Sequence, residues 1–143
     1  MFEGETLLAG KRAVITAGGN GFQLQDFNTG ASLTISGGSV MTTGGNAVKL
    51  NALIGTASVQ LRGATIKGMC VLRVAGTADV ASSVALTRVA GEAVTTHAVQ
   101  VVGAFSGALS VVGGALSAVA GDALHFDAHP TKDTATFARY FKF

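Results

Sequence analysis

Short stretches in which apolar and polar residues alternate recur along the chain at a spacing of about 25 residues. The clearest block is an apolar, polar, apolar triplet, found at residues 22–24, 48–50, 72–74, 99–101 and 124–126. Alternation with a period of two over so few residues is typical of half-buried β-strands. Each repeat is therefore predicted to be one structural unit that begins with such a strand.

Two further blocks follow the first in each repeat. The second block also alternates and lies at residues 33–35, 59–61, 84–86 and 109–111. The third and weakest block is centred on Val40, Ile66, Val89 and Leu116. Glycines flank this third block, at Gly37-Gly38, Gly63, Gly91 and Gly113-Gly114. Three strands per repeat, separated by turn residues, exclude a helical repeat protein.

A coil of three short strands, stacked on the same strands of the next coil, is a parallel β-helix. We expect an all-β solenoid of about five coils between Leu7 and Phe126. The amino-terminal stretch fits the same scheme, because residues 13–20 match residues 39–46 at an offset of 26. In this fold the inward apolar residues of successive coils form the core.

Composition agrees with one compact domain in the 143 residues. Twenty glycines and one proline argue against a helical bundle, and a net charge of +2 predicts no nucleic-acid partner. Residues 93–121 carry no Asp, Glu, Lys or Arg and are long enough to span a bilayer, but they keep the β-period, so no membrane partner is expected. The first 16 residues lack a long apolar stretch, which predicts no secretory signal peptide and a chain that starts at Met1.

The segments LTISGGSVMTTGGNAVKL and VQLRGATIKG resemble the right-handed parallel β-helix, or pectin-lyase-like, superfamily. The resemblance covers roughly residues 7–128 and implies the fold, not an activity. Members of this group include polysaccharide lyases and hydrolases, bacteriophage tailspikes and autotransporter passengers. The asparagine ladder of such folds is only partly present, since Asn20 and Asn46 align but are followed by Cys70, His97 and Asp122.

One outward column carries the candidate binding residues. The middle residues of the first block are Gln23, Lys49, Arg73, Gln100 and His125. Lys49 and Arg73 could bind an acidic partner or an anionic sugar. The alternative is a solvated face that keeps the protein soluble and discourages edge pairing.

The last coil carries a candidate metal site. Alternation places His125, Asp127 and His129 on one outward face, with the Cα atoms of successive members about 6.6 Å apart. Imidazole and carboxylate groups suit zinc, iron or nickel. The alternative is a polar face that contacts water, and we expect no obligatory cofactor.

Subunit contacts are predicted at two places. The outer wall of the fourth coil has little charge, with Val102 and Val112 facing outward, which indicates a buried interface. The chain divides into a β-helix at residues 1–128, including an amino-terminal cap, and a tail at residues 129–143. The tail caps the last coil or contacts another subunit through its aromatic residues Phe137, Tyr140, Phe141 and Phe143.

No catalytic cluster is evident. The acidic residues Asp26, Asp79, Glu92 and Asp122 fall in predicted turns of different coils, so no pair is expected to flank a scissile bond. Cys70 is predicted to be a small buried residue and not a nucleophile. We therefore expect no enzyme activity.

These observations lead to the hypothesis of a non-enzymatic, homotrimeric structural protein. By resemblance to bacteriophage β-helices, it is expected to be a virion component, such as a capsid decoration (cement) protein bound to the capsid shell or a small tail-associated protein. Two alternatives stay open. One is a carbohydrate-binding surface adhesin, and the other is a bactofilin-like scaffold that polymerises end to end.

Overall fold

The computed structural model describes residues 5–9, 14–27, 30–95, 97–127 and 135–137. In this part of the chain the secondary structure consists of β-strands arranged in three parallel sheets, with no helix. Sheet I contains β1 (Glu5–Ala9), β4 (Ser32–Ser36), β7 (Ser58–Arg62), β10 (Ser83–Thr87), β13 (Ala108–Val112) and β16 (Ala135–Phe137). Sheet II contains β2 (Val14–Ala17), β5 (Ser39–Thr42), β8 (Thr65–Gly68), β11 (Ala90–Ala93) and β14 (Ala115–Ala118). Sheet III contains β3 (Phe22–Phe27), β6 (Val48–Leu53), β9 (Leu72–Val74), β12 (Val99–Val101) and β15 (Leu124–Phe126).

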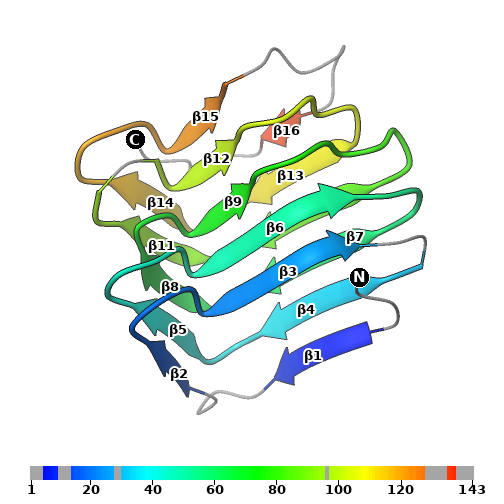
Figure 1. The fold of residues 1–143 in the computed structure, drawn as a ribbon. Helices are drawn as coiled ribbons and strands as arrows, with labels where there is room; N and C mark the ends of the chain where they lie inside the picture. The colour runs from blue at the N-terminus through cyan, green and yellow to red at the C-terminus, as the bar shows by residue number, and fades with distance from the viewer. Residues whose placement is uncertain (1–4, 10–13, 28–29, 96, 128–134, 138–143) are drawn as a thin grey trace.

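The chain visits the three sheets in turn, and each strand pairs with the strand one coil before and one coil after it (Figure 1). Every strand pair in the described residues is parallel. This arrangement confirms the predicted parallel β-solenoid with three strands per coil. The strands stack five or six deep, close to the five coils expected from the repeat.

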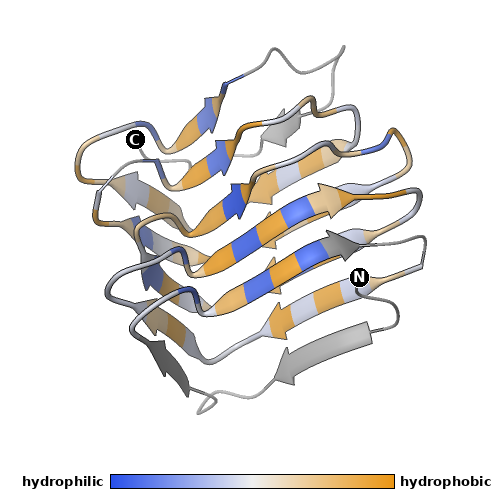
Figure 2. Ribbon diagram, viewed as in Figure 1, coloured by the Kyte–Doolittle hydropathy of each residue, from blue (hydrophilic) through white to orange (hydrophobic). Residues whose placement is uncertain are grey.

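The core is a set of inward columns, one residue per coil. In sheet I one column contains Leu33, Val59, Val84 and Leu109, all of them buried. Figure 2 shows the matching alternation of apolar and polar bands along the strands of sheet III. Each fully buried aliphatic side chain contributes about 1.5 to 3 kcal/mol to folding. The packing of equivalent apolar side chains from successive coils against one another therefore stabilises the solenoid.

A second buried column lies in the corner between sheets III and I, outside the three predicted blocks. Leu53 bridges to Ala78, and Ala78 bridges to Phe105 in the next coil. Phe105 is fully buried and packs edge-on against Phe126, with the ring centroids 6.1 Å apart. The sequence pattern did not predict this column, because single bridging residues show no alternation.

Each described corner between sheets I and II contains one or two residues with a left-handed backbone. The first of them is Gly37 (φ 73°), Gly63 (φ 59°), Arg88 (φ 54°) or Gly113 (φ 65°), and Gly38 (φ 68°) and Gly114 (φ 75°) follow in two of the corners. Glycine adopts positive φ without steric cost, which accounts for glycine at three of these four positions. Arg88 takes the same conformation in the third described corner, so the coil turns there without a glycine.

The prediction that Val89 centres the third block of its coil was wrong. Gly91 pairs with both Ile66 and Leu116 and takes the inward position, whereas Val89 is buried just before β11. A Cβ atom on Gly91 would lie 2.7 Å from Cδ2 of Leu116 and 2.9 Å from Cγ2 of Val71. The side chains of neighbouring coils thus fill the space that a larger residue would need. The sequence pattern, which relies on apolar side chains, could not show this position.

The amino-terminal register also differs by one residue from the prediction. Val14 pairs with Ser39, an offset of 25, whereas Asn20 contacts Asn46 at the predicted offset of 26. The turn after β5 is one residue longer than the turn after β2. The extra residue is absorbed in this turn, so the next strands keep their register.

Part of the predicted tail continues the solenoid. Strand β16 pairs in parallel with β13, with Ala135 opposite Leu109 and Phe137 opposite Val111. Tyr140, Phe141 and Phe143 lie outside the described residues. The described residues also contain no helix that is long and apolar enough to cross a membrane.

Substitution of an inward residue tests the register directly. Val74 on β9 is 1% exposed, and Val74→Asp would bury an unpaired carboxylate in the core. We expect a loss of about 4 kcal/mol or more in unfolding free energy, enough to prevent folding. Thermal unfolding followed by circular dichroism measures this, with the exposed Thr65→Asp on β8 as the control that stays near the wild-type midpoint. An unchanged midpoint for Val74→Asp would mean that Val74 does not face the core.

Candidate functional site

The outer face of sheet III carries the predicted polar column. Strand pairing places Gln23, Lys49, Arg73, Gln100 and His125 at successive levels of this column. The spacing in the sequence therefore predicted the alignment correctly. A ligand for Lys49 or Arg73 stays a prediction.

The two cations of this column lack counter-ions among the described residues. Lys49 and Arg73 are direct neighbours on paired strands, and neither forms an ion pair within the described part of the chain. The Nε atom of Arg73 is buried without a hydrogen-bond partner. A hollow of about 150 Å³ lies beside Lys49, and its lining includes Gln23, Gln25 and Asn51 but not Arg73. An anionic group in this hollow would meet uncompensated positive charge.

A second column runs along the turns that precede sheet III. It contains Asn20, Asn46, Cys70, His97 and Asp122, as the sequence alignment predicted. The Asn20 side-chain oxygen accepts a hydrogen bond of 2.8 Å from the backbone N–H of Asn46. His97 repeats this role, since its Nδ1 accepts a hydrogen bond of 2.9 Å from the backbone N–H of Asp122. A ring that accepts at Nδ1 is neutral and carries its proton on Nε2.

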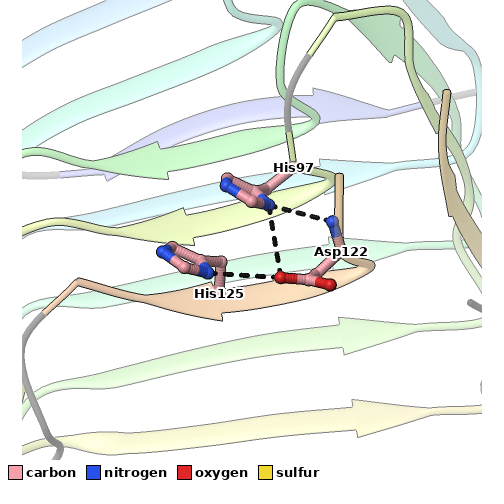
Figure 3. A group of neighbouring side chains, drawn as sticks. All are labelled: His97, Asp122 and His125. Atoms are coloured by element: carbon pink, nitrogen blue, oxygen red, sulfur yellow. Dashed lines mark hydrogen bonds and ion pairs between the residues drawn. The ribbon is translucent and has the colours of Figure 1, made fainter. Parts of the chain in front are cut away.

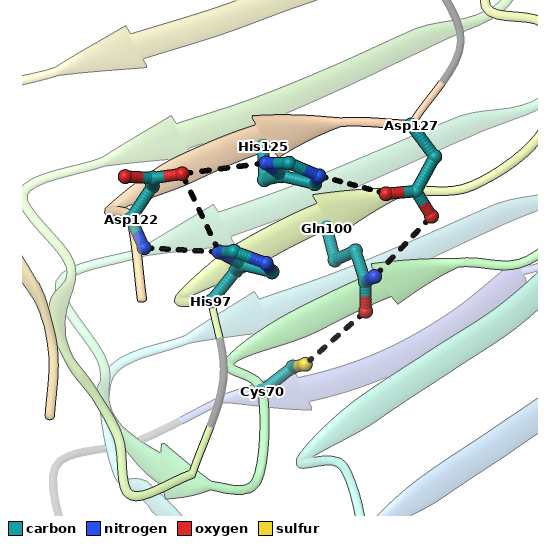
Figure 4. Close-up of polar contacts among 6 residues, drawn as sticks. All are labelled: Cys70, His97, Gln100, Asp122, His125 and Asp127. Carbon is teal, nitrogen blue, oxygen red and sulfur yellow. Dashed lines mark hydrogen bonds and ion pairs between the residues drawn. The ribbon is translucent and has the colours of Figure 1, made fainter. Parts of the chain in front are cut away.

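The two polar columns meet at the last two coils in a cluster of two histidines and two aspartates (Figures 3 and 4). The rings of His97 and His125 stack with centroids 4.0 Å apart and an angle of 5° between their planes. Asp122 Oδ2 lies 3.3 Å from Nδ1 of His125 and 3.7 Å from Nδ1 of His97. On the opposite edge of the ring, Nε2 of His125 lies 2.8 Å from Oδ1 of Asp127.

The cluster continues inward through Gln100. Its Nε2 donates a hydrogen bond of 3.3 Å to Oδ2 of Asp127, and its Oε1 lies 3.9 Å from the Cys70 sulfur (Figure 4). Cys70 is buried, as predicted. Gln100 therefore fixes the second oxygen of Asp127, and Asp127 in turn holds the orientation of His125.

The structure places two of the three residues of the predicted metal set, and a metal ion bound to them stays a prediction. It brings His125 and Asp127 into contact, whereas His129 lies outside the described residues. The additional members, His97 and Asp122, were predicted only as parts of the ladder column. One signal was present in the sequence: Asp122 stands one coil after His97 and three residues before His125, so it lies within reach of both.

The acidic residues are placed differently from the prediction. Asp26 lies on β3 and Glu92 on β11, not in turns. Glu92 pairs with Lys67 at 3.3 Å on the outer face of sheet II. Asp122 and Asp127, in contrast, converge on the two edges of one histidine ring. The prediction that Asp26 and Glu92 lie in turns was therefore wrong.

The predicted contact residues are only partly described. Val112 at the end of β13 is 40% exposed, and Val102 after β12 is half-buried. Phe137 lies on β16, and the other predicted tail contacts lie outside the described residues. Two exposed valines, Val80 and Val119, were not predicted as contact residues.

No family model, no curated protein and no solved structure matches the chain. The observed solenoid agrees with the fold that the β-helix resemblance implies.

The ladder role of His97 is testable by two substitutions. His97→Ala removes the acceptor for the Asp122 N–H, whereas His97→Asn replaces it with the residue that fills this position in the first two coils. We expect a loss of about 1 kcal/mol in unfolding free energy for the alanine variant and a smaller loss for the asparagine variant. Urea unfolding measures both values. Equal losses would show that the hydrogen bond does not stabilise the coil.

Proposed function

We propose that this β-solenoid is a non-enzymatic structural protein that associates through the outer face of sheet I. A β-solenoid is compatible with a structural or binding role. In this proposal the protein is a homotrimer that serves as a virion component, such as a capsid decoration or small tail-associated protein.

The observation that carries the proposal is the composition of the outer face of sheet I. Strands β4, β7, β10 and β13 each present three outward residues, and Arg62 is the one charged side chain among them. The others are serine, threonine, glutamine, alanine and valine. A regular sheet of small side chains with so little charge suits close packing against another flat surface. Depletion of charge distinguishes the core of an interface from ordinary surface.

Val112 is the last outward residue of β13 in this low-charge surface, whereas Val102 follows β12 of sheet III. Val112 is an exposed apolar residue at the end of β13, and Ser110 is the outward residue next to it on the same strand. Burial of Val112 in a contact would remove apolar surface from water. The surface therefore supports lateral association more than binding at the ends of the solenoid.

The virion part of the proposal rests on the resemblance to bacteriophage β-helices alone. Its test is mass spectrometry of particles banded on a caesium chloride gradient from lysed cells that carry the gene. Presence of the chain at a fixed ratio to the shell protein would support it. Absence of the chain from such particles would exclude a virion role and leave the self-association to be judged by itself.

Self-association is measured by size exclusion with multi-angle light scattering. We expect a mass of about three times the 14.3 kDa chain. Val112→Arg introduces a cation into the proposed contact and is expected to weaken assembly by about 10-fold or more, because the charge must be desolvated there. Ser117→Arg, on exposed β14 of sheet II, is the matched control and keeps the wild-type mass. A monomeric wild-type protein would overturn the proposed association.

A second candidate function is binding of an anionic carbohydrate on the outer face of sheet III. The observation that favours it is that Lys49 and Arg73 are neighbours without an ion-pair partner among the described residues, with a hollow lined by amide side chains beside Lys49. Carboxylate or sulfate groups accept the forked hydrogen bonds that a guanidinium donates. Glutamine and asparagine amides suit the hydroxyl groups of a sugar.

A glycan array that contains uronic-acid and sulfated chains beside neutral ones tests this candidate. We expect binding to acidic glycans that falls about 10-fold or more in Arg73→Ala, because a charged hydrogen bond is lost. Arg62→Ala removes a cation from sheet I and is the control that keeps the binding. Absence of binding to every glycan, or equal binding by Arg73→Ala, would remove the carbohydrate function.

A further inference from the structure

We propose that His97, Asp122 and His125 form a binding site for one divalent transition-metal ion, with Zn²⁺ as the best-suited ion. The site joins the last two complete coils, since His97 precedes β12 whereas Asp122 and His125 belong to the next coil. It differs from the set predicted from the sequence, which followed one strand. It also does not depend on the proposed self-association.

The distances suit a single ion. One ligand atom from each of the three residues lies within 4.8 Å of the other two. Zinc holds nitrogen and carboxylate oxygen at about 2.0 to 2.2 Å, which separates two tetrahedral ligands by about 3.3 to 3.5 Å. The distance from Nδ1 of His125 to Oδ2 of Asp122 is 3.3 Å, and the distance from Nδ1 of His97 to the same oxygen is 3.7 Å. Because the two rings stack with an angle of 5° between their planes, one ring must turn out of the stack for both nitrogens to bind the same ion.

Hydrogen bonds orient both rings for metal binding. Nδ1 of His97 accepts the backbone N–H of Asp122, so its lone pair points toward this residue. For His125 we assign the proton to Nε2, because the contact of Nε2 with Asp127 is the shorter of its two carboxylate contacts, at 2.8 Å against 3.3 Å. The Nδ1 lone pair of His125 then faces Oδ2 of Asp122. Such a carboxylate behind the imidazole is the usual support of a metal-binding histidine.

This arrangement brings two ring nitrogens close to one carboxylate oxygen, and in the assigned tautomer the Nδ1 lone pair of His125 faces that oxygen (Figure 3). Acceptors that converge in this way repel one another unless a cation lies between them. A proton shared between His125 and Asp122 is one solution, and a metal ion is the other. Coordination by His97 replaces its hydrogen bond to the Asp122 N–H, which can then bond to water at this exposed turn.

The donor set and the exposure define the class of ion. Two imidazoles and one carboxylate favour Zn²⁺, Cu²⁺ or Ni²⁺ over Mg²⁺ and Ca²⁺, which prefer oxygen ligands. The side chains of His97 and His125 are 21% and 36% exposed, so an ion can enter without unfolding of the coil. Water can take the fourth position. The bound ion would cross-link the two coils at the carboxyl-terminal end of the solenoid.

Isothermal titration of the full, untagged chain with ZnCl2 after removal of metal with EDTA tests the proposal. We expect one ion per chain, and a thermal midpoint that rises with ZnCl2 but not with MgCl2. His125→Ala is expected to weaken Zn²⁺ binding by about 100-fold or more, and Asp127→Asn by about 10- to 100-fold, through loss of ring orientation. Lys49→Ala, in the same outward column, is the matched control and keeps the wild-type affinity.

The substitution His97→Asn separates a loss of Zn²⁺ binding from a failure to fold. It keeps a side-chain acceptor for the Asp122 N–H, as Asn20 does in the first coil, but removes one imidazole ligand. Loss of Zn²⁺ binding with a native circular dichroism spectrum supports the site. Absence of binding by the wild-type chain at 1 mM ZnCl2 would overturn the site and leave the shared proton as its explanation. Equal binding by the wild-type chain and by His97→Asn/His125→Ala would also overturn it.

Discussion

The whole structure depends on the parallel backbone hydrogen bonds between one coil and the next. These bonds also continue through the turns, for example from the N–H of Gly21 to the carbonyl of Asn46 and from the N–H of Ala47 to that of Cys70. Because backbone groups must find partners when they leave water, each coil has to follow the path of its neighbour. A residue is therefore placed above its counterpart about 25 positions away, and both the core columns and the outward columns result from this constraint.

This constraint explains which parts of the fold could be predicted from the sequence. The strands of sheets I and III alternate clearly, so their blocks and their register were predicted correctly. Sheet II was harder, because Gly91 occupies an inward position without a side chain and Arg88 takes a corner conformation that glycine takes elsewhere. Both residues follow the same backbone path as the equivalent residues of other coils, but neither is the residue type that usually occupies its position. The Phe105 column was missed for a related reason, since isolated bridges have no period of their own.

The candidate site was predictable as columns but not as a cluster. Repeat spacing aligned His97 with Asp122 and placed His125 at the end of the outward column, which the strand pairing confirms. Contact between these columns depends on the direction of the Asp122 carboxylate in the turn before β15 and on the stacking of the His97 and His125 rings. Both depend on side-chain conformations in the last coils. The repeat spacing predicts which residues align from coil to coil, but it does not predict side-chain conformations.

The position of His97 in the asparagine ladder has a broader consequence. At this position Asn20 and His97 each provide a lone pair that accepts the backbone N–H of the next coil, although one is an amide and the other an imidazole. The rest of the side chain is then not determined by the fold. Positions of this kind allow a repetitive scaffold to differ chemically from one coil to the next while its backbone remains the same. In this protein the column carries asparagine in the first two coils and histidine and aspartate in the last two, so the two ends of the solenoid present chemically different surfaces.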